Sequence, residues 1–187
     1  MEISNFSTFP LENPKYVLPV TIKYTQSGIE KKWEAIRSHN SVAVLLYHKE
    51  KNAFLLVKQF RPPVYLNNKS HGITYELCAG ILDKEVDSLQ TVREEIDEEC
   101  GFNVSIDQIQ KITSFYTSVG FAGAHQTLFY AEIDESMKIH DGGGINDEEI
   151  ELFYLPVEQA KLFALDEDIP KTPGLMFSFF WFFDVKA

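Results

Sequence analysis

Three glutamates near the middle of the chain have a spacing that suits cation binding. Glu95, Glu98 and Glu99 stand at positions i, i+3 and i+4 of a segment expected to be helical. At about 100° per residue, these positions share one flank of a helix. Like charges this close destabilise a helix, and a hard divalent cation removes that cost by binding carboxylate oxygens. The spacing favours a metal site, and an acidic solvated helix face is the alternative interpretation.

The helix that must carry these carboxylates is predicted over residues 88–100. Asp87 or Ser88 is suited to begin it and Gly101 to end it. An apolar stripe follows from residues that recur three and four apart, namely Leu89, Val92, Ile96 and Cys100. The glutamates lie beside this stripe rather than opposite it, which places them at the rim where the helix meets a sheet.

The remaining pattern predicts a mixed sheet with helices on its faces, an α/β (α+β) sandwich. Apolar or alternating segments predict strands at 17–26, 29–37, 42–47, 53–60, 74–78, 112–118, 126–133 and 150–155. A short helix is predicted at 157–163, and an aromatic helix closes the chain. The first two strands form a hairpin suited to dimerisation. We therefore divide the chain into an N-terminal extension, residues 1–38, and a main domain, residues 39–187.

Composition narrows the class of protein. The net charge of −11 argues against a protein that coats nucleic acid, because neutralising phosphates needs clustered Lys and Arg. Cys78 and Cys100 fit neither a zinc pattern nor a disulfide scaffold. The N-terminus resembles no secretory signal, and the most apolar segment, Leu175 to Phe183, is too short to span a membrane. We expect a cytoplasmic protein with no nucleic-acid or membrane partner.

The segment from Gly80 to Phe102 resembles the Nudix box, in which a glycine and a glutamate precede Arg-Glu-aliphatic-x-Glu-Glu-x-Gly-aliphatic. The residues in register are Glu95, Ile96, Glu98, Glu99, Gly101 and Phe102. Two positions depart from the motif. Val86 replaces the first glutamate, with Glu85 beside it, and Glu94 replaces the arginine, with Arg93 beside it.

Flanking stretches resemble one branch of that family, the UDP-sugar pyrophosphatases, which are close to the ADP-ribose pyrophosphatases. The stretches are SVAVLLY, LVKQFRPPVY, YELCAGILD, GFAGAHQTLFY and DIPKTPGLMF. The resemblance implies a Nudix α/β/α sandwich, a homodimer built with the N-terminal strands, and hydrolysis of a nucleoside diphosphate sugar. UDP-glucose would give UMP and glucose 1-phosphate. One alternative is ADP-ribose, giving AMP and ribose 5-phosphate, and another is a degenerate domain that binds a nucleotide without cleaving it.

The resemblance also implies roles for particular residues. Glu95 and Glu99 are the expected principal ligands of Mg²⁺, or of Mn²⁺, with Glu98 completing the cluster and the Ala79 carbonyl as a further ligand. Arg61 follows a buried strand, and its guanidinium fork matches a pair of pyrophosphate oxygens. A surface salt bridge is its alternative role.

Further candidates come from one strand and two loops. Glu76 either faces the cleft or pairs with a lysine. Glu148 is the first candidate and Glu149 the second for the loop carboxylate that activates water, with a solvated loop as the alternative. His125 and the neighbouring Gln126 follow a glycine-containing turn and are candidates for substrate contact.

Overall fold

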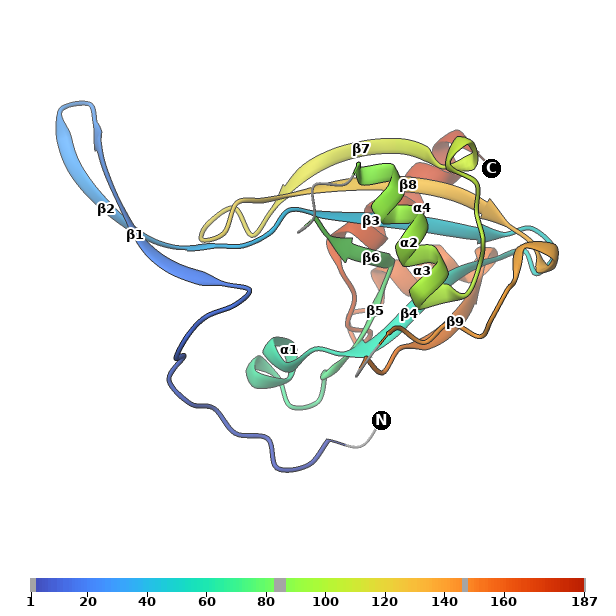
Figure 1. Ribbon diagram of the computed structural model, residues 1–187, viewed down its shortest axis with the longest axis horizontal. Coiled ribbons are helices and arrows are strands. Elements are labelled where there is room, and N and C mark those ends of the chain that lie inside the picture. Colours follow the sequence, from blue (N-terminus) through green and yellow to red (C-terminus); the bar gives the residue numbers. More distant parts are fainter. Residues whose placement is uncertain (1–2, 83–86, 146–147, 187) are drawn as a thin grey trace.

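The computed structural model describes residues 3–82, 87–145 and 148–186. Strands β1 (Leu18–Gln26) and β2 (Ile29–Arg37) form an antiparallel hairpin that is a sheet of its own. Figure 1 shows this hairpin projecting away from the body of the molecule. The predicted hairpin is therefore confirmed. It also contacts the body, because the Trp33 Nε1–H donates to the Gly120 carbonyl at 2.7 Å and the Ile36 N–H donates to the Phe121 carbonyl at 2.8 Å.

The body is built on a seven-stranded mixed sheet. Its strands are β3 (Ser41–His48), β4 (Ala53–Phe60), β5 (Ile73–Glu76), β6 (Cys78–Ile81), β7 (Gln110–Thr117), β8 (Ala124–Ile133) and β9 (Glu151–Pro156). The main path runs β5-β4-β3-β8-β7, while β6 pairs with β3 and β9 pairs with β4. Only the β3–β8 pair is parallel among these described strands.

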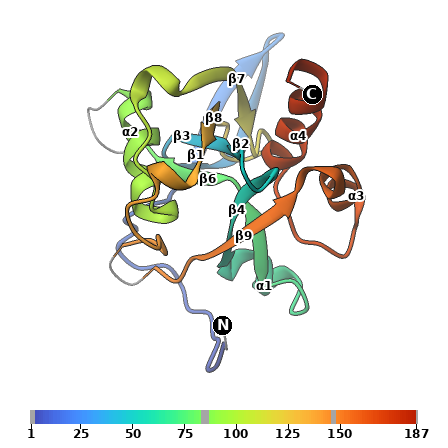
Figure 2. The same ribbon diagram turned by 90° about the vertical axis from the view of Figure 1, so that its right-hand side faces the viewer.

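Helices cover both faces of the sheet, as Figure 2 shows with α2 on one side and α3 and α4 on the other. The helices are α1 (Pro62–Asn67), α2 (Ser88–Glu95), α3 (Ala160–Leu165) and α4 (Pro173–Val185). Short 3₁₀ turns lie at Ile106–Gln108, Glu135–Met137 and Val157–Gln159. The predicted α/β/α sandwich is confirmed.

The alternation of side chains along β3 explains why two helical layers are needed. Val42, Val44 and Leu46 pack toward α2, whereas Ala43 and Leu45 pack toward α3 and α4. Successive side chains of a strand point to opposite faces, so a continuous apolar run has to be covered on both sides. The aromatic C-terminal helix meets that need, because Phe179 and Phe182 are buried in the second cluster.

Three elements differ in kind from the prediction. The segment expected as one strand at 74–78 is two strands, β5 and β6, separated at Leu77. The sequence pattern does not predict helix α1, because the two prolines after Arg61 indicate the end of a strand. Proline is favoured at the first turn of a helix, where its missing N–H costs nothing.

The third difference lies at the end of the glutamate helix. The predicted helix 88–100 is α-helical only to Glu95 and continues as one π turn, Ile96–Cys100. The Gly101 N–H donates to the carbonyls of Asp97 and Ile96. A π turn inside a helix is a frequent feature of functional sites. Within the described ranges, no helix combines the length and apolarity that crossing a membrane requires.

Candidate active site

Glu99 lies at the centre of the candidate site and is only 5% exposed. Its Oε2 accepts a hydrogen bond of 3.0 Å from the backbone N–H of Ala79. Burial raises the pKa of Glu99 from 4.5 to about 8, and the charges of Glu95 and Glu148 contribute to the increase. The Ala79 N–H acts in the opposite direction. Burial and the neighbouring carboxylates thus disfavour the charged form of Glu99.

Glu95 lies directly over the backbone of β6. A Cβ built on Gly80 would come within 1.9 Å of the Glu95 Oε1. Any larger residue at 80 would therefore displace this carboxylate, which explains the glycine without reference to backbone conformation. Strand β6 and helix α2 consequently hold Glu95 and Glu99 on the same rim of the sheet, as the sequence predicted.

The loop after Gly142 docks on the end of the π turn. The N–H groups of Gly143 and Gly144 donate to the carbonyls of Glu99 and Glu98, at 2.8 and 3.1 Å. These carbonyls belong to the last helical turn, where partners within the helix are missing. Gly101 makes this docking feasible, because its φ is 77° and a Cβ there would lie 2.1 Å from the His140 carbonyl oxygen.

That loop brings Glu148 to the site. The Glu148 Oε2 accepts a hydrogen bond of 3.0 Å from the Ile145 N–H, and its charge acts on both Glu99 and Arg61. No described contact brings Glu149 to the same place, and its side chain is exposed. Glu98 is half-buried, and its described contact is through the backbone.

Arg61 and Glu76 form a bidentate ion pair across β4 and β5. Arg61 Nε donates to Glu76 Oε1 and an Nη donates to Oε2, both at 2.7 Å. The side chain of Glu76 is 10% exposed, whereas that of Arg61 is 43% exposed. Glu76 therefore pairs with Arg61 rather than with a lysine. This pair, together with the charges of Glu99 and Glu148, raises the pKa of Arg61.

Several sequence candidates lie outside this group. The His125 ring packs edge-on against Tyr116, with centroids 5.3 Å apart, and its backbone N–H donates to Asn40. Glu94 accepts a hydrogen bond from Gln90 at 2.8 Å. The Nε of Arg93 is buried with no hydrogen bond among the described residues. The motif positions Glu85 and Val86 lie outside the described residues.

The two cysteines are free and buried beside the carboxylates. Burial raises the pKa of the Cys78 thiol well above its usual range, and Cys100 and Glu99 act in the same direction. A thiol that stays protonated is a poor nucleophile. The raised pKa therefore argues against Cys78 as a nucleophile.

A second group of possible ligands lies at the other end of β3. Ligand atoms of His48, Glu50 and Glu135 lie within 4.8 Å of one another. Lys51 already pairs with Glu135, and its backbone N–H donates to His48 Nδ1 at 3.4 Å. Ala79 pairs with Ala43 near the start of β3, so this group is separate from the carboxylates around Glu99.

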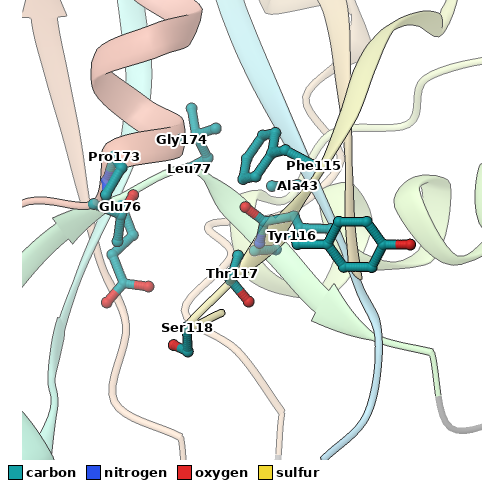
Figure 3. Close-up of a pocket in the computed structure, with 12 residues that line it drawn as sticks. Ala43, Glu76, Leu77, Phe115, Tyr116, Thr117, Ser118, Pro173 and Gly174 are labelled. Atoms are coloured by element: carbon teal, nitrogen blue, oxygen red, sulfur yellow. The ribbon is translucent and has the colours of Figure 1, made fainter. Parts of the chain in front are cut away.

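A cavity of about 380 Å³ adjoins the site, and sequence reasoning did not anticipate it. Glu76 and Ala79 belong both to this cavity and to the carboxylate site. Figure 3 shows Glu76 on one side of it and Thr117 and Ser118 on the other. Gln126, which the sequence named beside His125, lines it.

Comparison with known proteins agrees with the fold and the carboxylate helix. The NUDIX domain family matches residues 37–173, so the chain belongs to the NUDIX family. The chain is thus a Nudix pyrophosphohydrolase, and enzymes of this family need a divalent metal. The predicted family is confirmed.

Similar curated proteins include two sugar-nucleotide enzymes from mammals. The uridine diphosphate glucose pyrophosphatase NUDT14 of Bos taurus is 36% identical over 200 aligned positions, covering 92% of this chain and 90% of that protein. That of Mus musculus is 33% identical, covering 90% and 88%. A GDP-mannose pyrophosphatase of Cronobacter sakazakii is 36% identical over 132 positions, covering 71% and 68%.

Proposed function

We propose that this enzyme hydrolyses the pyrophosphate bond of a nucleoside diphosphate hexose, with UDP-glucose as the first candidate. The products would be UMP and glucose 1-phosphate. The observation that carries this proposal is the buried Glu99 carboxylate held by the Ala79 N–H, with Glu95 against the adjacent Gly80 and with Ala79 and the Arg61-bound Glu76 lining the same cavity. The names of the relatives add the substrate class, since glucose and mannose are both hexoses while uracil and guanine differ.

The residues around Glu99 fit a hard divalent cation. Glu95 and Glu99 would be its principal ligands, with Glu98 and the Ala79 carbonyl completing the set. Two features support the fit. The Glu95 carboxylate lies close against Gly80, and the pKa of Glu99 is raised. The hydrogen bond described for the Glu99 carboxylate comes from a neutral backbone N–H. Carboxylate oxygens favour Mg²⁺, and Mn²⁺ is an alternative. When bound, the metal would activate water and neutralise charge on the leaving phosphate.

The protein groups have separate tasks in this proposal. Arg61 would bind two oxygens of the pyrophosphate, and Glu76 would hold the guanidinium in position. A water oxygen bonds to phosphorus while the bridging P–O bond breaks. Glu148, or Glu149 as the second candidate, would accept the proton of that water. Direct contact of His125 with the substrate stays a prediction.

The hairpin supports a proposed homodimer. Leu18, Ile22 and Tyr24 share one face of β1, and Trp33 stands directly opposite Ile22. All four side chains are between 37% and 51% exposed. A two-stranded hairpin is marginally stable by itself, and an exposed apolar face marks an interaction site. Pairing of this face with a second copy would bury it.

We also propose a cytoplasmic location, which the free thiols of Cys78 and Cys100 support.

Product analysis tests the function. Purified protein with Mg²⁺ is offered UDP-glucose and ADP-ribose in parallel, with EDTA and Glu99→Gln as controls. We expect release of UMP and glucose 1-phosphate that EDTA and the substitution abolish. Faster release of AMP from ADP-ribose would replace the hexose assignment. Absence of metal-dependent cleavage with both substrates would favour the nucleotide-binding alternative.

A further inference from the structure

The cavity beside Glu76 and Ala79 begins where the carboxylate site ends. Glu76 accepts a hydrogen bond from Arg61, and the Ala79 N–H donates to Glu99. Because Glu76 and Ala79 also line the cavity, these two residues connect it to the carboxylate site. A pyrophosphate held by Arg61 would therefore place one of its two substituents at the mouth of the cavity. The cavity would then hold either the nucleoside or the sugar, and its lining distinguishes between them.

One part of the cavity lining is apolar, and it comes from parts of the chain that are distant in sequence. Its members are Ala43, Leu77, Phe115, Pro173 and Gly174. Phe115 provides the aromatic surface, because the ring of neighbouring Tyr116 points away from the other labelled residues in Figure 3. A single aromatic surface suits the C–H face of a pyranose, whereas stacking on both faces of a nucleobase needs a second flat group.

The rest of the cavity lining is polar, and its members are Glu76, Thr117, Ser118, Gln126 and Thr172. Hydroxyl groups both donate and accept hydrogen bonds, and a side-chain amide does both with separate atoms. A hexose presents hydroxyls around the edge of its ring. A cavity lined by hydroxyl and amide groups as well as by apolar residues therefore matches the edge and face of a hexose.

Gln126 is held in a defined orientation. Its Nε2 donates to Ser41 Oγ at 3.1 Å. Its Oε1 lies beside Gly174, where an added Cβ would be 3.1 Å from this oxygen and 3.3 Å from the Phe115 ring. The first turn of α4 thus leaves just enough room for the amide. Among the described residues, Oε1 and the second N–H of this amide have no hydrogen-bond partner, so both can bind a ligand.

We propose that this cavity binds the hexosyl group of the substrate and that Gln126 hydrogen-bonds one of its hydroxyls. The assignment rests on the proposed function and names which end of the substrate is recognised. The volume of about 380 Å³ is close to that of a dozen water molecules at about 30 Å³ each, enough for a monosaccharide. Selection among substrates would then depend more on the sugar than on the base.

Binding of the two product halves tests this assignment without requiring turnover. Glucose 1-phosphate and UMP are titrated separately, with Mg²⁺, into the wild-type protein, Gln126→Leu and Gln110→Leu. Gln110 is exposed at the far end of β7 and serves as the matched control. Gln126→Leu should weaken the affinity for glucose 1-phosphate about tenfold, because about one hydrogen bond is lost. The affinity for UMP should change by less than about twofold. Gln110→Leu should change neither.

A second variant guards against misfolding. Gly174→Ala keeps Gln126 but crowds its Oε1, and alanine is a better helix former than glycine. It should weaken glucose 1-phosphate in the same direction while the thermal unfolding temperature is maintained. Weakened UMP with unchanged glucose 1-phosphate would assign the cavity to the nucleoside and overturn the proposal. Unchanged affinity for both ligands, or no binding of glucose 1-phosphate by the wild type, would also overturn it.

The same titrations separate this proposal from the proposed function. If the wild type cleaves no nucleotide sugar but Gln126→Leu still weakens glucose 1-phosphate selectively, the function fails and the cavity assignment stands. If cleavage of UDP-glucose is normal and the affinity for glucose 1-phosphate does not depend on Gln126, the proposed function stands and the cavity assignment fails.

Discussion

The Ala79 backbone N–H donates to the carboxylate of Glu99 at 3.0 Å, which fixes the buried glutamate at the junction of β6 and the π turn. This hydrogen bond holds Oε2 while burial and two neighbouring carboxylates disfavour its negative charge. Glu99 is thus positioned by the fold and left electrostatically unfavourable. A bound cation would relieve this state, and the first two predictions depend on it.

Glu99→Gln should abolish turnover with little loss of folded stability. Glutamine keeps the shape of the side chain and an acceptor for the Ala79 N–H, but it removes the charge that a metal ligand supplies. Initial rates with UDP-glucose and Mg²⁺, together with thermal unfolding, measure both effects. A Glu99→Gln enzyme with normal rates would show that the metal site is wrongly assigned.

The metal-free protein should lose stability as the pH rises through Glu99's titration range. The folded-state pKa is raised from 4.5 to about 8, so the folded state binds the proton more tightly than the unfolded chain. The stability that this proton contributes is complete below pH 4.5 and is lost as the pH rises to about 8. Urea unfolding in EDTA across this range measures it, on the order of a few kcal/mol. Glu99→Gln should remove most of this dependence, and an unchanged slope in the variant would contradict the prediction.

Divalent metal should stabilise the wild type in a way that requires the carboxylates. A ligand that binds only the folded state raises its stability by about 2.7 kcal/mol at a hundred times its Kd. We expect Mg²⁺ or Mn²⁺ to raise the unfolding temperature of the wild type and to have little effect on Glu95→Gln. Glu135→Gln, at the other end of β3, is the matched control and should respond as the wild type does. A response lost in Glu135→Gln would move the metal to that group.

The ion pair of Arg61 with Glu76 should set substrate binding. Arg61→Lys retains a positive charge but cannot reproduce the two parallel hydrogen bonds, so both the pyrophosphate contact and the hold of Glu76 are weakened. We expect kcat/KM to fall by about tenfold to a hundredfold, equivalent to about 1.4 to 2.8 kcal/mol. Lys58→Arg, on the strand that ends just before Arg61, is the control. Normal kcat/KM in Arg61→Lys would restrict Arg61 to a structural role.

The carboxylate site was predictable because its parts are close in sequence or lie in one motif. Glu95 and Glu99 stand on one helix, and the Ala79 segment ends the strand before it. Helical periodicity does not predict the π turn, and the turn's terminal carbonyls accept from Gly143 and Gly144 of a loop distant in sequence. Periodicity also distinguishes poorly between one strand and two, so the break at Leu77 was missed.

The cavity could not be predicted for a similar reason. Ala43, Phe115 and Gly174 come together only when β3, β7 and α4 pack, and none carries a motif by itself. Gln126 was named only as the neighbour of His125. Side chains alternate along β8, so only one of His125 and Gln126 can face the cavity. Which of them does so depends on the register of the strand rather than on residue type.

The hairpin face provides the last prediction. Ile22 and Trp33 are directly cross-strand on the apolar face, whereas Lys23 and Lys32 are cross-strand on the opposite face one position along, and all four are exposed. Ile22→Lys would place a charge in the proposed contact and should convert a dimer to a monomer in size-exclusion chromatography with light scattering. Lys23→Glu, which changes charge on the other face, should leave the dimer intact. A wild type that elutes as a monomer at micromolar concentration would remove the dimer proposal, because this apolar face would then stay exposed without a second copy.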